Sequence, residues 1–159
     1  PEGNKGIGSY TGSDSIVVTP DTYDGGPVTK IDQYAFANRN SEKAIRFSDS
    51  VVELSNTCCA LNEGLEVVVL GANTKTIGEG AFLQCTALRE IKLNDGLEKI
   101  ATISFSMCEN LESITIPESV TTIESGAFTG LEKTLVIHGK AGSAAEEFAK
   151  TEGIQFVAE

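Results

Sequence analysis

The sequence predicts a solenoid of short parallel strands, with one strand per 23-residue repeat and a helix followed by a strand at the C-terminal end. Three observations support this fold class. Apolar residues recur every 23 positions, at Ile31, Leu54, Ile77, Ile100 and Ile123. A second column at the same interval places a large residue after a small one, and a third shows the apolar–polar alternation of strands. Because one repeat cannot bury its own apolar edge, we expect the repeats to stack and share one core.

The second column is aromatic with a single exception. It reads Phe36, Cys59, Phe82, Phe105 and Phe128. Equivalent residues of stacked repeats lie about 4.8 Å apart, so the rings are expected to form a spine. Cys59 fills less volume than a ring, which predicts a looser or locally repacked second repeat.

Length and composition indicate a single domain and exclude some classes of partner. The 159 residues are enough for one domain, and a hydrophobic fraction of 40% is enough for a core. The formal net charge of −11 argues against nucleic acid and anionic membranes as partners, because phosphate groups are bound by clustered Lys and Arg. No apolar run approaches the roughly 18–20 residues of a membrane span, so membrane insertion is not expected. Residue 1 is proline and the only methionine is Met107, so we expect a further segment to precede it.

We expect one domain over residues 1–159, made of three parts. Residues 1–27 form an N-terminal segment, in which Ile16–Val18 is expected to be a strand because a proline and two glycines follow it and indicate a turn. Residues 28–139 hold five repeats. Residues 140–159 form a C-terminal cap.

The last repeat is interpreted as shortened by two residues. The alternation of Leu135 and Ile137 matches that of Ile114 and Ile116 in the preceding repeat. This alignment places His138 opposite Pro117.

The C-terminal cap has the pattern of a short helix. Ser143 followed by Glu146 is a capping box, and Gly153 is expected to end the helix in the left-handed conformation. Ala145, Phe148 and Ala149 supply its apolar stripe.

The strand columns match a known repeat pattern. Leu88–Leu93 and Leu111–Ile116 fit the L-x-x-L-x-L core of leucine-rich repeats, whose period lies between 20 and 29 residues. The run Ile77–Leu88 resembles the repeat of the BspA-like leucine-rich-repeat family of bacterial surface proteins, and Ile114–Pro117 resembles that family's strand end. The resemblance extends to Tyr10–Ile31 and Gly142–Phe156. It implies a leucine-rich-repeat solenoid.

One surface column alternates in charge. It reads Lys43, Glu66, Arg89, Glu112 and, with the shortened last repeat, Lys133. Opposite charges in neighbouring repeats attract, so this column would favour the correct alignment of the stack. Coincidence on a solvated face is the alternative.

The sequence contains no recognisable catalytic, cofactor-binding or metal-binding constellation. His138 is the only histidine, and no acidic residue has a spacing to it that indicates a catalytic role. The acidic run around Asp14, Asp21 and Asp24 lacks the spacing of a calcium loop. Cys85 and Cys108 are one repeat apart, so we expect buried free thiols rather than a disulfide.

The outward positions of the strands form the expected partner-binding surface, on the concave sheet face of the solenoid. Val67 and Val69 stand out there, because exposed valines between charged repeats make a small apolar patch. Coverage of these valines by the N-terminal segment is the alternative. The candidate partner-binding residues are Arg46, Val67, Val69, Glu90, Lys92, Ser113, Thr115, Thr134 and Val136.

The resemblance implies a non-catalytic recognition or adhesion module that binds a protein, of host or extracellular-matrix type, at the cell surface or after secretion. A glycan-binding module is a second interpretation. The composition disfavours it, since sugar sites use exposed aromatic rings and the chain has no Trp and only three Tyr. A third interpretation is a passive spacer in a surface protein. The sequence indicates no oligomeric state.

Overall fold

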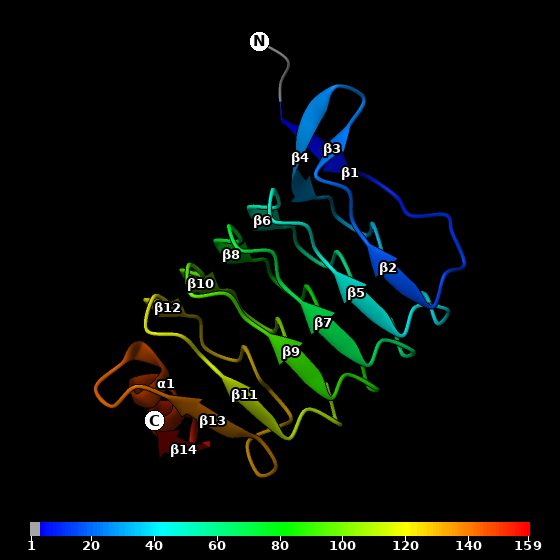
Figure 1. Ribbon diagram of the computed structural model, residues 1–159. Helices are drawn as coiled ribbons and strands as arrows, with labels where there is room; N and C mark the ends of the chain where they lie inside the picture. Colours follow the sequence, from blue (N-terminus) through cyan, green and yellow to red (C-terminus); the bar gives the residue numbers. More distant parts are fainter. Residues whose placement is uncertain (1–3) are drawn as a thin grey trace.

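The computed structural model describes residues 4–159, so the first three residues of the N-terminal segment lie outside the described part of the chain. The described residues form a solenoid in which two rows of parallel strands run along the stack (Figure 1). The predicted solenoid is therefore confirmed. Its division into residues 1–27, 28–139 and 140–159 stays a prediction.

The first row, called the front row below, carries the longer strands of the repeats. A four-stranded sheet begins it, and a three-stranded sheet continues it toward the C-terminus. Its members are β2 (Ile16–Val18), β5 (Ala44–Arg46), β7 (Val67–Val69), β9 (Glu90–Lys92), β11 (Ser113–Thr115), β13 (Val136–Gly139) and β14 (Gln155–Ala158).

The second row, called the back row, consists mostly of two-residue strands. The sequence analysis expected one strand per repeat, and these strands are an additional one in each repeat. The back row contains β1 (Lys5–Ile7), β4 (Gly26–Ile31), β6 (Glu53–Leu54), β8 (Thr76–Ile77), β10 (Lys99–Ile100) and β12 (Thr122–Ile123), and β3 (Thr22–Tyr23) forms a hairpin with β4.

The 23-residue column found in the sequence belongs to this back row. Register pairs Ile31 with Leu54, Leu54 with Ile77, Ile77 with Ile100, and Ile100 with Ile123. The first four of these side chains are fully buried between the two rows. The periodicity thus reports residues that stack directly on one another in the core.

The aromatic column forms the predicted spine over part of its length. Phe105 stacks between Phe82 and Phe128 with ring centroids 5.4 and 5.2 Å apart and nearly parallel planes. Cys59 interrupts the spine, and Phe36 instead packs 5.3 Å from the ring of Tyr10. The interruption of the spine at Cys59 is thus observed, and looser or altered packing of the second repeat stays a prediction.

The alignment of the last repeat was wrong. Ile114 pairs with Ile137 and Thr115 pairs with His138, so the last strand keeps the full spacing of 23 residues and His138 does not face Pro117. The inward position that follows Ile137 is the buried Gly139, where an added Cβ would lie 3.1 Å from a backbone oxygen. Because this position carries no side chain, the alternation visible in the sequence was shifted by two residues.

The C-terminal cap is confirmed. Helix α1 (Ala144–Glu152) begins at Ser143, whose hydroxyl accepts the backbone N–H of Glu146, and ends at Gly153 with φ of 72°. The ring of Phe148 lies 5.8 Å from that of Phe128, so the helix covers the end of the aromatic spine. Strand β14 then pairs with β13.

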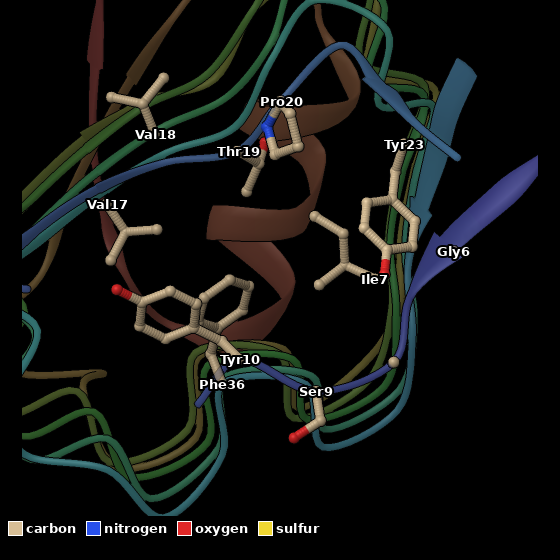
Figure 2. Close-up of a pocket in the computed structure, with 11 residues that line it drawn as sticks. Gly6, Ile7, Ser9, Tyr10, Val17, Val18, Thr19, Pro20, Tyr23 and Phe36 are labelled. Atoms are coloured by element: carbon tan, nitrogen blue, oxygen red, sulfur yellow. The ribbon is translucent and has the colours of Figure 1, made fainter. Parts of the chain in front are cut away.

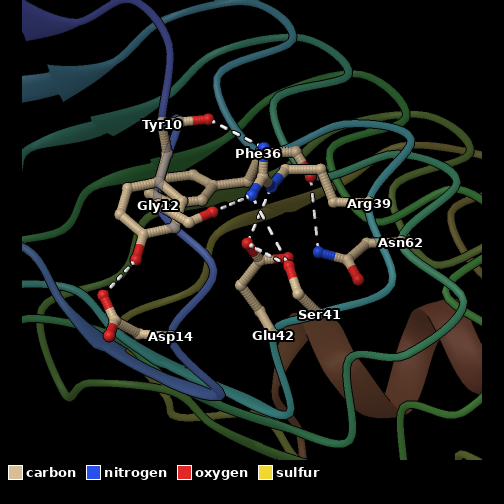
Figure 3. A network of polar contacts seen from close by, with 8 residues as sticks. All are labelled: Tyr10, Gly12, Asp14, Phe36, Arg39, Ser41, Glu42 and Asn62. Atoms are coloured by element: carbon tan, nitrogen blue, oxygen red, sulfur yellow. Dashed lines mark hydrogen bonds and ion pairs between the residues drawn. The ribbon is translucent and has the colours of Figure 1, made fainter.

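The N-terminal segment contains the expected strand. β2 pairs in parallel with β5 and starts the front row. A cluster around Arg39 ties the preceding residues to the first repeat (Figure 3). The Arg39 guanidinium donates to the carboxylate of Glu42 at 2.7 Å and to the carbonyls of Tyr10 and Gly12. Because the Glu42 side chain is fully buried and that of Arg39 is only 24% exposed, this ion pair is largely shielded from water.

The charge column is confirmed in part. Glu66 lies 3.4 Å from Lys43 and 3.7 Å from Arg89, which joins three successive repeats. Glu112 has no ion-pair partner within residues 4–159, and Lys133 is outside the column because the last repeat is not shortened. The ladder therefore covers only the first three members.

Reversing these charges should change the melting temperature in a pattern that depends on pairing. Glu66→Lys creates repulsion with both neighbours and should lower Tm by about 1–4 °C, since exposed pairs contribute about 0.2–1 kcal/mol each. Adding Arg89→Glu should restore part of the loss, and adding Lys43→Glu should restore the rest. Thermal melts at low and high salt check this. Losses that simply add, or that persist unchanged in 0.5 M salt, would contradict the ladder.

Candidate functional site

The outward side chains of the front row form one continuous face. In the β5–β7–β9 sheet, register aligns Arg46, Val69 and Lys92 in one column, and Val67 and Glu90 in the other. Successive side chains of a strand point to opposite sides, so these residues point away from the core while Ile45, Val68 and Ile91 point into it. We call this surface the front face.

The structure brings eight of the nine predicted residues to the front face. Ser113 and Thr115 on β11 stand 23 residues after Glu90 and Lys92, at the same positions of the next repeat, and Val136 pairs with Ser113. Thr134 is the exception, because it lies in the turn before β13, where its N–H donates to Leu131. The residue that pairs with Thr115 is His138, which the shortened alignment had hidden.

Besides His138, two further residues of the front face were missed. Ile16 and Val18 on β2 align with Ala44 and Arg46, and they are 69% and 64% exposed. The alternation of residues 16–18 predicted a strand but did not show which side faces water. The apolar patch thus extends from β7 to the first strand of the row.

Val67 and Val69 remain accessible in the described part of the chain. Both side chains are half-buried. β2 lies beside β5 in the plane of the sheet rather than across β7. Within residues 4–159, the N-terminal segment therefore does not cover the valines.

The front row has one break, between β9 and β11. In the other repeats the residue after the strand donates its N–H to the next strand, as Leu70 does to Lys92 and Ile116 to His138. Among the described residues, Leu93 makes no such bond to Thr115, while the back row is continuous at this level. A hollow of about 450 Å³ lies over the break. It is lined by Glu90, Lys92, Ser113 and Thr115 together with Arg89 and Asp95.

A second hollow lies at the N-terminal end of the stack (Figure 2). It has a volume of about 400 Å³, and its lining includes Ile7, Tyr10, Val17, Tyr23 and Phe36. No charged side chain lines it within the described residues. The hollow is where the core between the two rows opens to solvent, so it suits an apolar group.

The only histidine of the chain and the possible metal ligands lie as follows in the described residues. Within residues 4–159, no group of three or more His, Cys, Asp and Glu side chains has the arrangement of a metal site. His138 is half-buried on β13, and its Nδ1 lies 3.0 Å from the Glu159 carboxylate. No helix in this part of the chain has the length and apolar character needed to cross a bilayer.

All four cysteines are buried free thiols, as expected. The Cys85 and Cys108 thiols donate to the carbonyls of Cys59 and Phe82, each at 3.1 Å. Burial raises the pKa of Cys85 to about 12 and also raises the pKa values of Cys59 and Cys108. Because the thiolate is the reactive form, these groups are poor nucleophiles at neutral pH.

The native protein should therefore show no thiol that reacts with a disulfide reagent at pH 8. Unfolding in guanidinium without reductant should release four reactive thiols, one from each cysteine. A colorimetric thiol assay checks both states. Rapid reaction of the native protein, or fewer than four thiols after unfolding, would contradict the buried free thiols.

Comparison with known proteins supports the predicted resemblance. Residues 20–134 match the BspA type leucine-rich repeat region in six copies. The chain is 28% identical to the leucine-rich repeat protein TpLRR of T. pallidum, with a TM-score of 0.80 over 84% of this chain and 62% of that one. It is also 28% identical to a leucine-rich cell surface protein of Faecalibacterium prausnitzii, with a TM-score of 0.72 over 88% of this chain and 42% of that one.

A more distant likeness concerns the fold alone. The pneumococcal vaccine antigen PcpA is 21% identical with a TM-score of 0.62, over 86% of this chain and 43% of that one. The chain thus spans less than two thirds of the length of these solved proteins. Among curated proteins, none matches the sequence.

Proposed function

Because the chain belongs to the BspA-type leucine-rich repeat family, we propose that it is a non-catalytic recognition or adhesion module that binds a protein partner through the front face. Stacked repeats create an extended surface that suits a large partner. The family and the fold are typically non-catalytic, which agrees with this role.

The observation that carries the proposal is the apolar patch on the front face. Ile16 and Val18 on β2 and Val67 and Val69 on β7 belong to one sheet, and charged residues border them. Exposed apolar patches with a polar rim are typical of protein-binding sites. The hollow over the β9–β11 break lies on the same face and could receive a side chain of the partner.

The proposed location is the cell surface or the medium outside the cell. One structural neighbour is described as a cell surface protein and another as a vaccine antigen. The partner class, of host or extracellular-matrix type, belongs to the same proposal.

Binding of the purified domain to a panel of matrix proteins and glycans tests the proposed function. We expect saturable binding to a protein, and the double change Val67→Glu and Val69→Glu should abolish it, since two carboxylates would have to be desolvated at the interface. Binding to glycans alone would favour the glycan-binding interpretation. Absence of any binding would favour a passive spacer.

A further inference from the structure

Positive charge without a carboxylate partner is concentrated on the front face. The chain has 12 Lys and Arg residues and 23 Asp and Glu residues. Nine of the cations have a carboxylate within 4.0 Å, for example Lys75 with Glu98 at 2.9 Å and Lys140 with Glu118 at 2.8 Å. Across residues 4–159, the cations without one are Arg46, Lys92 and Lys133.

Two of these three cations share one column of the front face. Arg46 and Lys92 lie on either side of Val69 and are exposed. Two strand steps separate them, which corresponds to about 9.6 Å between backbones. In an acidic chain where most cations are paired, two exposed cations at one site attract anionic groups.

Two carboxylates near this column are paired with other cations, and Asp95, which lines the same hollow as Lys92, lies more than 4.0 Å from its amine. Glu90 lies on the neighbouring column and is 3.8 Å from Arg89. Glu66, in the charge ladder, contacts both Lys43 and Arg89. Lys43 and Arg89 thus largely balance the charges of Glu66 and Glu90. The charges of Arg46 and Lys92 are therefore available to interact with a partner.

We propose that the front face binds an acidic polypeptide segment that carries carboxylates on either side of apolar side chains. The carboxylates meet Arg46 and Lys92, and the apolar side chains cover Val67, Val69 and the exposed Ile16 and Val18. This inference rests on the proposed function and specifies the chemistry of its partner.

A polypeptide fits this face better than a polyanion such as nucleic acid or a sulfated glycan. A dense polyanion could pair with Arg46 and Lys92 but has no apolar groups to cover Val67, Val69, Ile16 and Val18. A peptide that alternates acidic and apolar side chains can pair with the two cations and also cover the apolar side chains.

A pair of labelled peptides tests the inference. One probe is a fluorescein-labelled decapeptide of alternating Glu and Val, and the other has Lys in place of Glu. Fluorescence anisotropy should show the Glu peptide binding about tenfold more tightly than the Lys peptide, with affinity falling as salt rises from 50 to 300 mM. The double variant Arg46→Glu with Lys92→Glu should reverse the preference.

The matched control is Lys133→Glu. Lys133 also lacks an ion-pair partner within residues 4–159 but lies off the front face, so the change should leave the preference unaltered. All three positions are exposed, and circular dichroism melts should show folded variants.

Four results would overturn the inference. These are no binding of the Glu peptide, equal binding of the two peptides, an equal effect of Lys133→Glu, or tighter binding of heparin or DNA than of the Glu peptide. The proposed function is judged separately. If a matrix protein still binds the Arg46→Glu, Lys92→Glu variant but not the Val67→Glu, Val69→Glu variant, the front face remains the binding site and only the acidic partner is wrong.

Discussion

Replacing Arg39 with alanine should destabilise the protein by about 3–5 kcal/mol, because it leaves the carboxylate of Glu42 buried without its cation. The Glu42 side chain has no exposed surface, and within residues 4–159 the Ser41 hydroxyl, at 3.0 Å, is the only group besides Arg39 that donates to it. For a chain of this length the loss corresponds to a fall in Tm on the order of 6–20 °C. Thermal or denaturant unfolding measures it.

Two variants separate this effect from a general loss of charge. Lys140→Ala removes an ion pair whose side chains are 60% and 66% exposed, and it should cost less than about 1 kcal/mol. Arg39→Met combined with Glu42→Leu removes both buried charges and should recover most of the stability. That double variant still lacks the bonds to the carbonyls of Tyr10 and Gly12, so hydrogen exchange near these residues should be faster. An Arg39→Ala variant no less stable than Lys140→Ala would refute the role of the pair.

Phe105→Ala should lower the free energy of unfolding by a similar amount, about 3–5 kcal/mol. The same unfolding experiments measure it. Phe105 is fully buried and stacks on rings on both sides, so its removal leaves a cavity and ends two aromatic contacts. Because each repeat contacts mainly its neighbours, the change also uncouples the repeats on either side.

Met107→Ala is the control for Phe105→Ala. Met107 lies two positions away in the same turn and is 47% exposed, so its replacement should change the free energy of unfolding by no more than about 0.5 kcal/mol. A Phe105→Ala variant as stable as Met107→Ala would show that the spine is not part of the stabilising core.

The regular part of the fold could be predicted because buried positions recur at a fixed interval. Ile77 and Ile100 occupy the same place in successive repeats, so the period in the sequence is the period of the stack. The last strand could not be aligned in the same way. Its inward position at Gly139 carries no side chain, and Leu135, two positions before Ile137, supplied a competing apolar residue.

The N-terminal contacts left no comparable signal. Arg39 and Glu42 look like ordinary surface charges in the sequence, and their burial depends on Tyr10 and Gly12, which are distant in the chain. Most of the candidate site could be predicted, since strand alternation determines which side of each repeat faces water. The contribution of Ile16 and Val18 could not, because it depends on the register of β2 with β5.

The break between β9 and β11 was also invisible in the sequence. Both strands follow the repeat pattern, and Leu93 stands where Leu70 and Ile116 stand in the neighbouring repeats. The structure nevertheless places the two strands in different sheets.

The central claim is that the front face carries partner recognition, and one calorimetric comparison tests it most directly. The protein selected from the binding panel is titrated into two double variants. One carries Val67→Glu and Val69→Glu on the front face, and the other carries Thr76→Glu and Thr122→Glu on the back row. We expect only the first variant to lose binding, while both variants remain folded. Equal losses in both, or a loss confined to the back-row variant, would contradict it.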